Sequence, residues 1–300
     1  MGIIINVVVP VFLIAGIGFS ARRWLDLDPR PVNRLALYVF VPALLFNALL
    51  TTQMGGDELT RIAIFAIALT AVLIILGMTT GRLLHLTRSE TSGFTLSMSF
   101  SNAANYGLPV ALFAFGQDGF DRAVVFASFS SILIFTVAVF VAARGKLPWR
   151  QAILPAARIP VIWAGLAAVA LRSLGIELPT VVERAVTVLS GGAVPIIILL
   201  LGMQIASMRL YAIRLPVLAA VAGRLLVSPA IGMVLVALLQ PSPLTAKVLI
   251  LEAAMPTAVN VTLLASEFDA EPDLVSSVAL LTTAVSIITV TGWVAYLQSL

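Results

Sequence analysis

Two apolar stretches of the chain each hold polar and helix-breaking residues within a few positions of one another. The first reads "NAANYGLP", from Asn102 to Pro109, and the second reads "MPTAVN", from Met255 to Asn260. Asparagine amides donate and accept hydrogen bonds, proline removes a backbone donor, and glycine adopts conformations that other residues resist. The two stretches therefore predict interrupted helices whose free backbone groups and amide side chains are available to a ligand.

The expected ligand is a small organic anion. A helix N-terminus carries partial positive charge and unpaired N–H groups, so an interrupted helix offers an anion a favourable site partway along its length. A second interpretation stays open, because proline and glycine are frequent in membrane helices and asparagine also bonds neighbouring helices. The presence of such a stretch in each half of the chain favours the ligand site.

Two charged residues lie within long apolar runs, Arg224 in "VAGRLLVSP" and Glu252 in "LILEAAMP". At a rise of about 1.5 Å per residue across an apolar core of roughly 30 Å, their axial offset would be about 9 Å, so the two side chains could meet. Ionisable residues at such depth indicate function, here charge complementarity to the anion or a titratable coupling group. The alternatives are a fixed ion pair, or an arginine that binds carbonyls freed by a helix interruption.

Asn47 and Gln204 are further polar candidates within apolar runs. We expect both to lie on a scaffold wall that faces the anion, although a hydrogen bond between two helices explains each of them as well. The chain has no cysteine, and its single histidine, His85, falls in a loop. No metal site and no other cofactor is therefore expected.

Signatures of enzymes and channels are missing from the sequence. No aspartate falls within a predicted span, and neither a zinc-binding helix motif nor a phosphate-binding Walker loop is present. Repeated pore loops or rings of charge, which are typical of channels, are also absent. The chain is therefore not expected to be an enzyme, and a channel is a weaker interpretation than a carrier.

The elements that position these residues must be membrane helices. Of the 300 residues, 60% are hydrophobic and 11% are charged, and the mean hydropathy is +1.09. A helix that crosses a bilayer needs roughly 20 apolar residues. Apolar runs and breakers predict an all-α polytopic membrane protein of ten spans, near residues 3–21, 34–51, 60–80, 91–115, 122–142, 159–174, 184–206, 216–239, 246–266 and 274–297.

Basic residues predict how these spans are oriented. Loops that follow odd-numbered spans hold twelve lysines and arginines, and loops that follow even-numbered spans hold five. Because basic loops stay in the cytoplasm, both termini are predicted on the extracytoplasmic side of the cell membrane. Topology accounts for most of the net charge of +4, so the expected surroundings are a lipid bilayer, and no nucleic acid is expected as a partner.

Five spans in each half would place the two halves upside down relative to one another in the membrane. A shift of 152 or 153 residues brings Pro42 onto Pro195 and Asp121 onto Asp273. Inverted repeats with interrupted helices at matching places are typical of secondary transporters. The predicted division is a first five-helix repeat over residues 1–142, a cytoplasmic linker over 143–158, and a second five-helix repeat over 159–300.

The sequence around both interruptions resembles the auxin efflux carrier family of transporters, which has plant and bacterial members. The similar stretches are "SNAANYGLPVALFAFG" with "FDRAVVFASFSSILIFTV", and "LEAAMPTAVNVTLLASEFDAEPDLVSSVALLTTAVSIITV" from Leu251 to Val290. The resemblance implies two inverted repeats in which the interrupted spans four and nine cross and form the substrate site. It also implies that spans one, two, six and seven form a scaffold, that spans three to five and eight to ten slide against it as an elevator, and that a homodimer forms.

Substrate-binding residues follow from the resemblance by position. They are Asn102, Asn105, Tyr106, Gly107 and Pro109 in the first interruption, and Pro256, Thr257 and Asn260 in the second. The sequence thus predicts a secondary active transporter that exports or imports a small organic anion, such as a mono- or dicarboxylate, by an elevator-type alternating-access mechanism. The alternatives are a sodium-coupled organic-anion symporter similar to the bile acid carriers, and a channel.

Overall fold

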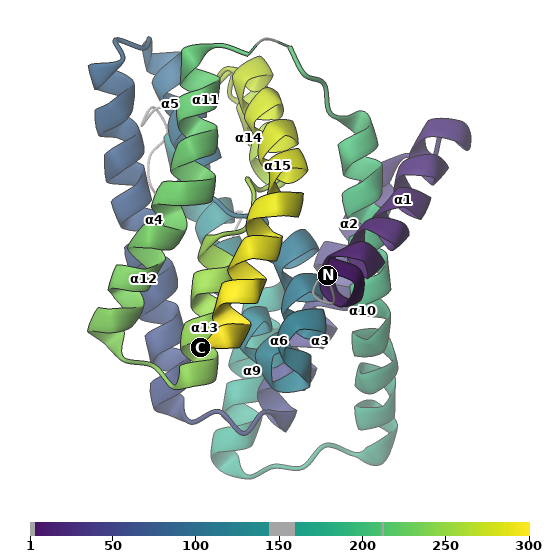
Figure 1. The fold of residues 1–300 in the computed structure, drawn as a ribbon. Helices are drawn as coiled ribbons and strands as arrows, with labels where there is room; N and C mark the ends of the chain where they lie inside the picture. The colour runs from purple at the N-terminus through teal and green to yellow at the C-terminus, as the bar shows by residue number, and fades with distance from the viewer. Residues whose placement is uncertain (1–3, 144–159, 212) are drawn as a thin grey trace.

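The computed structural model describes residues 4–143, 160–211 and 213–300 (Figure 1). Within these ranges the regular structure is helical, and the one β-type contact is an isolated bridge between Ser101 and Thr257. Residues 144–158 of the predicted linker lie outside the described ranges. The all-α fold class is therefore confirmed for the part of the chain that the structure describes.

In the first half, short π-helical segments, labelled η, adjoin several of the α-helices. The elements are η1 (Ile4–Val8), α1 (Val9–Trp24), α2 (Pro29–Leu35), η2 (Ala36–Phe40), α3 (Val41–Thr51), α4 (Gly56–Leu83), α5 (Arg88–Ser99), η3 (Ala103–Gly107), α6 (Leu108–Leu133), η4 (Ile134–Ala138) and α7 (Val139–Ala142). Single π turns of this kind are frequent at functional sites.

The described part of the second half is built in the same way. The elements are α9 (Pro160–Leu174), α10 (Thr180–Ser207), α11 (Leu215–Ala222), η5 (Gly223–Val227), α12 (Ser228–Leu239), α13 (Pro243–Ala253), α14 (Asn260–Glu267) and α15 (Pro272–Ser299). Proline opens α13 and α15, where its missing N–H costs no helical hydrogen bond.

Seven helical stretches of the described chain are long and apolar enough to cross a membrane, which identifies a multi-pass membrane protein. They are Asn6–Trp24, Pro29–Thr51, Gly56–Leu83, Ala103–Ala142, Thr180–Ser207, Leu215–Leu239 and Pro272–Ser299. Large apolar side chains on their outer faces fit contact with lipid, since Leu13, Ile75 and Ile288 are 65%, 63% and 77% exposed.

The difference between these seven stretches and the ten predicted spans has identifiable causes. The apolar helix α9 has only 15 residues. Non-helical residues 100–102 separate α5 from η3 at the start of the first predicted interruption, whose remaining residues are helical, and non-helical residues 254–259 separate α13 from α14 at the second. The long stretch Ala103–Ala142 contains a sharp kink at Gly116, whose φ of 68° is a conformation that favours glycine.

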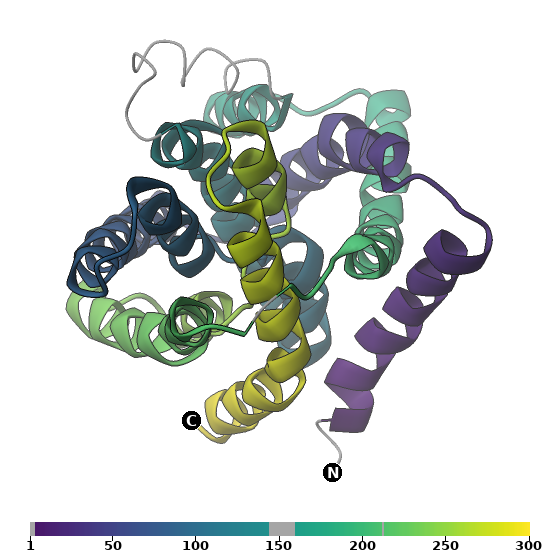
Figure 2. The same cartoon turned by 90° about the horizontal axis from the view of Figure 1, so that it is seen from above.

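The helices pack in two groups. One group consists of α1, α2, α3, α9 and α10, and the other of α4, α5, α6 and the helices from α11 to α15. Seen from above, α14 and α15 run between α4, α5 and α12 on one side and α1, α2 and α10 on the other (Figure 2). The two groups contact one another chiefly where η3 lies against α10 and where α6 lies against α3.

The helix α5 is fixed at its start by a capping box. The Thr87 side chain accepts a hydrogen bond from the Glu90 backbone amide at 3.2 Å, and the Thr87 amide donates to the Glu90 carboxylate at 2.9 Å. The hydrogen bond from the Thr87 backbone lowers the pKa of Glu90 below its ordinary value. This arrangement defines where α5 enters the bundle, one helix length before the first interruption.

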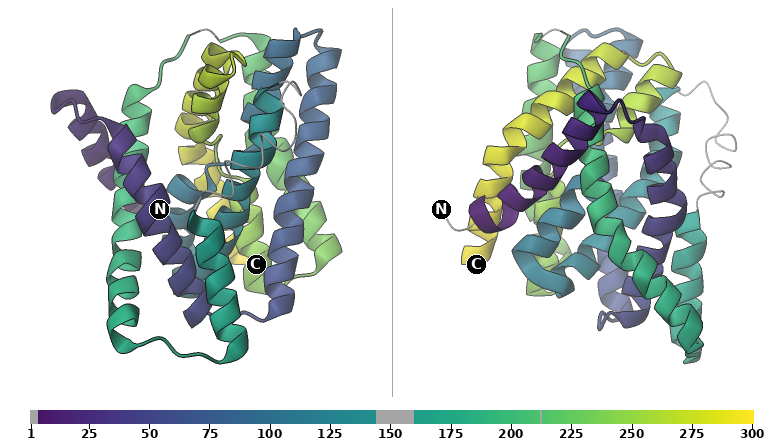
Figure 3. Two further views of the ribbon diagram at one scale, coloured as in Figure 1. Left: turned by 180° about the vertical axis from the view of Figure 1, so that it is seen from behind. Right: turned by 90° about the vertical axis from the view of Figure 1, so that its right-hand side faces the viewer.

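Within the first group, α1 crosses α10 at very short range (Figure 3). A Cβ atom added to Gly18 would lie 2.9 Å from the Leu199 Cα, and one added to Gly202 would lie 2.6 Å from the Ala15 carbonyl carbon. Small residues let membrane helices approach closely and gain van der Waals contact. The crossing therefore depends on glycine at both positions.

We predict that Gly202→Ala destabilises the protein by about 1–3 kcal/mol, because the added methyl group must push α10 away from the α1 backbone. Thermal unfolding of the purified protein in detergent measures the effect. The matched control is Gly16→Ala on α1, since a Cβ there would meet nothing within 4 Å. Equal melting temperatures for the two variants would contradict the close crossing.

Candidate functional site

The two interruptions cross and pair with one another through their backbones. The Asn102 amide donates to the Pro256 carbonyl at 2.7 Å, and the Ala258 amide donates to the Phe100 carbonyl at 2.9 Å. These two bonds flank Ser101 and Thr257, which face each other as an antiparallel bridge. Backbone groups freed in a membrane must find partners within the protein, and here each interruption supplies partners to the other.

Thr257 strengthens this pairing through its side chain. Its hydroxyl donates to the Ser97 carbonyl at 2.7 Å, and its amide donates to the Thr282 hydroxyl at 3.1 Å. Thr257 and Thr282 are fully buried. Thr257 therefore joins the ends of α5 and α13 to α15, and its hydroxyl already has a partner within the protein.

Arg224 binds the C-terminal ends of both helices that enter the interruptions. Its fully buried guanidinium donates to the Met98 carbonyl of α5 at 3.0 Å and to the Ala253 carbonyl of α13. It also donates to the Ser228 hydroxyl, which itself donates to the Ala253 carbonyl at 2.8 Å. The π turn η5 carries Arg224, so a wider helical turn brings the arginine to this position.

This arrangement decides between the alternatives for Arg224. The only ion pair between described residues joins Arg22 and Asp26 at 2.6 Å, and none joins Arg224 to Glu252. Arg224 instead binds carbonyls freed by the interruptions. Because these carbonyls are the negative ends of two helix dipoles, the arginine compensates them, and the positive ends of the helices that follow lie at η3 and α14.

Three of the predicted site residues are asparagines near the N-terminal, positive ends of η3 and α14: Asn102, Asn105 and Asn260. The Asn105 side chain in η3 donates to the Gln204 side chain of α10 at 3.1 Å. Two predicted site residues, one from each packing group, are therefore in direct contact. Asn102 Nδ2 and Asn260 Oδ1 are buried and have no hydrogen-bond partner among the described residues. Buried polar atoms are rarely left unpaired, so Asn102 has a spare donor and Asn260 a spare acceptor.

The other predicted residues have different surroundings. The Tyr106 ring lies edge-to-face against Phe12, and its hydroxyl accepts from Ser286 at 3.1 Å, so it faces α1 and α15. Gly107 ends η3, and Pro109 lies in the first turn of α6, where its missing N–H is tolerated. The Pro256 carbonyl belongs to the backbone pairing. Asn47 lies half-buried in α3, and its backbone carbonyl accepts from the Thr51 hydroxyl at 2.9 Å.

A cavity of about 380 Å³ opens beside the interruptions, between the two packing groups. Gln204 and Val259 reach it from the interior, and its polar walls include Arg22, Arg30 and Arg209. Arg22 lies in the last turn of α1, Arg30 lies in the first turn of α2, and Arg209 follows α10. The sequence predicts a cytoplasmic position for all three, but no local pattern in it indicates that they converge on one cavity.

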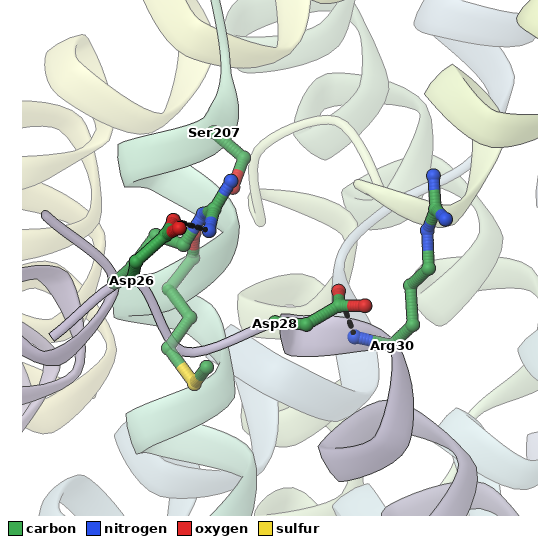
Figure 4. A network of polar contacts seen from close by, with 6 residues as sticks. Asp26, Asp28, Arg30 and Ser207 are labelled. Carbon is green, nitrogen blue, oxygen red and sulfur yellow. Dashed lines mark hydrogen bonds and ion pairs between the residues drawn. The ribbon is translucent and has the colours of Figure 1, made fainter.

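The arginines differ in how they are held (Figure 4). Arg22 donates to the Asp26 carboxylate at 2.6 Å and to the Ser207 hydroxyl at 3.2 Å, so its charge is partly compensated. The Arg30 backbone amide donates to the Asp28 carboxylate at 3.0 Å, while its guanidinium extends from α2 with no hydrogen bond drawn to it (Figure 4). Asp273 also lines the cavity, so three arginines and one aspartate face it, and the net positive charge of this lining attracts anions.

A helical bundle with interrupted helices that pair in its interior, next to a polar cavity, defines a membrane transport protein. The family model described as "Membrane transport protein" matches residues 3–146 and 147–294. The chain therefore belongs to this family of transporters, and the resemblance to the auxin efflux carriers is confirmed.

Relatives in other organisms have names that agree with this family. An uncharacterized transporter of Methanothermobacter thermautotrophicus is 27% identical over 89% of this chain and 88% of its own length. A protein of Rhizobium meliloti named "Putative malonate transporter" is 25% identical over 100% of this chain and 97% of its own length. An uncharacterized transporter of Methanocaldococcus jannaschii is 24% identical over 96% of this chain.

We predict that Arg224→Gln lowers the free energy of unfolding by about 3 kcal/mol, because buried carbonyls lose charge-assisted hydrogen bonds. Arg224→Lys should fall between this variant and the unmodified protein, since one ammonium cannot reproduce the geometry of a guanidinium fork. Thermal unfolding in detergent measures both. The exposed Arg34→Gln serves as control, and a loss no larger than that of the control would show that the carbonyls do not need the arginine.

Proposed function

We propose that the protein is a secondary carrier of a small organic anion, such as a mono- or dicarboxylate, in the cell membrane. The observation that supports this function best is the pairing of two interruptions whose negative helix ends bind Arg224. Their positive ends, together with the amides of Asn102, Asn105 and Asn260, form the anion site of this proposal. A carboxylate there would accept from Asn102 Nδ2, which lacks a partner among the described residues.

The cavity supports a small anion as the substrate. A volume of about 380 Å³ is at the lower end of the range for small-molecule sites, roughly 300–1,000 Å³. The arginines at its mouth would raise the local concentration of anions. The name of the Rhizobium meliloti relative points to malonate, a small dicarboxylate, as a compound to test first.

Alternating access in this proposal arises from movement between the two packing groups. The scaffold would be α1, α2, α3, α9 and α10, and the remaining helices would carry the anion past it as an elevator. The close glycine crossing of α1 and α10 fits a rigid scaffold. The proposal includes ten spans as two inverted repeats, residues 1–142 and 159–300, with both termini outside the cytoplasm, and a homodimer.

A sodium-coupled symporter would need free carbonyls at the interruptions to hold the ion. The carbonyls of Met98 and Ala253 already accept from Arg224, and those of Phe100 and Pro256 accept from backbone amides. A channel would need a continuous path, whereas the Asn105–Gln204 hydrogen bond joins the two packing groups at the inner end of the cavity. These contacts favour the carrier over both alternatives.

Uptake of malonate, malate and indole-3-acetate into proteoliposomes tests the proposed function. We expect saturable uptake and accelerated counterflow for one of these anions. In Asn105→Ala and Asn260→Ala, the half-saturation concentration should rise by about tenfold or more, because a hydrogen bond to a charged group contributes about 1.5–3 kcal/mol.

The control for these variants is Asn6→Ala, whose side chain is exposed on η1. Its uptake should match that of the unmodified protein. Saturable uptake that is unchanged in Asn105→Ala and Asn260→Ala would move the site away from the interruptions. Flux that rises linearly with concentration and shows no counterflow would contradict a carrier.

A further inference from the structure

Glu252 is a fully buried carboxyl group that the proposed anion site does not use. It lies on α13, one residue before the carbonyl of Ala253 that binds Arg224. Both of its carboxyl oxygens are buried and lack a hydrogen-bond partner among the described residues. An ionised carboxylate without any partner in such surroundings is very unfavourable, so the group requires a cation or a proton.

The carboxyl group of Glu252 is held against the first interruption. A Cβ atom added to Gly107 would lie 2.6 Å from Glu252 Oε1 and 2.7 Å from its carboxyl carbon. Glycine at position 107 therefore leaves the space that this carboxyl group fills. Since Gly107 and Asn105 belong to the same π turn, η3, the charge of Glu252 acts directly on the segment that would bind the anion.

No group on the described elements packed against α13 forms a hydrogen bond or an ion pair with the Glu252 carboxyl group. In η3, the Tyr106 hydroxyl is bonded to Ser286. In η5, the terminal nitrogens of Arg224 are bonded to Met98, Ala253 and Ser228, and its Nε, which has no hydrogen-bond partner among the described residues, forms no ion pair with Glu252. The helix α12 has no charged residue. The other charged residues on α13 and on the helices packed against it form no ion pair with Glu252: Lys247 on α13, Asp57, Glu58, Arg61 and Arg82 on α4, Asp118, Asp121 and Arg122 on α6, and Asp273 on α15.

We propose that Glu252 is a proton-binding site and that its proton crosses the membrane together with the anion. The carboxylate takes up one proton and becomes a neutral carboxylic acid. An ionised Glu252 would repel an anion at η3 through a medium of low dielectric constant, whereas the neutral acid does not. Proton and anion therefore favour each other's binding, which is the condition for cotransport. The cotransport part rests on the proposed function, while the proton site itself does not.

Infrared spectroscopy of the protein in liposomes tests the proton site without any substrate. At neutral pH and without sodium, the unmodified protein should show the carbonyl stretching band of a buried carboxylic acid. The band should be absent in Glu252→Gln and shifted, but present, in Glu252→Asp. Carboxylate bands for Glu252 at neutral pH would overturn the proposal, and so would loss of the acid band on addition of sodium, because that result identifies a sodium site.

A control variant and the Glu252→Asp variant together show whether the acid band belongs to Glu252. Glu183→Gln, which changes an exposed carboxyl group on α10, should leave the acid band unchanged. If Glu252→Gln does not fold, the shift of the band in Glu252→Asp still assigns it. An acid band that is the same in the unmodified protein and in Glu252→Asp would belong to another residue and would overturn the assignment.

Transport under a pH gradient tests the coupling. An inward gradient of about one pH unit should drive about tenfold accumulation of the anion if one proton accompanies it. Glu252→Gln should keep counterflow exchange and lose this accumulation. Saturable counterflow without accumulation in the unmodified protein would overturn the coupling and leave the carrier intact. Absence of saturable counterflow would overturn the proposed function, while the infrared result still decides the proton site.

Discussion

The pairing of backbone groups between two interrupted helices is the interaction on which the rest of the structure depends. In lipid, an unpaired N–H or carbonyl group costs several kcal/mol, so a helix cannot stop in the membrane without partners. Here the Asn102 amide meets the Pro256 carbonyl, and the Ala258 amide meets the Phe100 carbonyl. Each interruption is tolerable only because the other lies across it, and one interruption alone would leave two backbone groups unpaired.

The distribution of charge around this crossing follows from the direction of the helices. The chain enters both interruptions at a helix C-terminus and leaves both at a helix N-terminus, so negative ends and positive ends are separated. Arg224 compensates the negative ends by binding Met98 and Ala253. In the function that we propose, the positive helix ends near Asn105 and Asn260 attract the anion; Glu252 lies against the segment that carries Asn105. A single arrangement of four helix ends thus underlies both the anion site and the proton site that we propose.

Local features of the sequence predicted the interruptions, whereas the contacts between distant segments could not be predicted. Pro256 lies in the gap between α13 and α14, whereas Gly107 and Pro109 lie in the helical turns that follow the gap at residues 100–102, so these residues located the first interruption only to within about two helical turns. The partners of Arg224 depend on how α5, α13 and η5 align in space, and the sequence therefore left its role open between an ion pair and carbonyl binding. The Asn105–Gln204 hydrogen bond joins residues 99 positions apart. The sequence did not predict that Arg22, Arg30 and Arg209 line one cavity, because basic residues near the ends of membrane spans are already explained by topology.

Disulfide formation between cysteines placed at Ser101 and Thr257 tests the crossing most directly. The natural chain has no cysteine, so the introduced pair would hold its only thiols. Facing residues in a non-hydrogen-bonded antiparallel pair have Cα atoms about 4.5 Å apart, which lies within the range of disulfides. The crossing predicts a rapid intramolecular disulfide in the double variant under mild oxidation, read by mass spectrometry, with none in either single variant. Thiols that stay free and open to alkylation in the folded double variant would contradict the account.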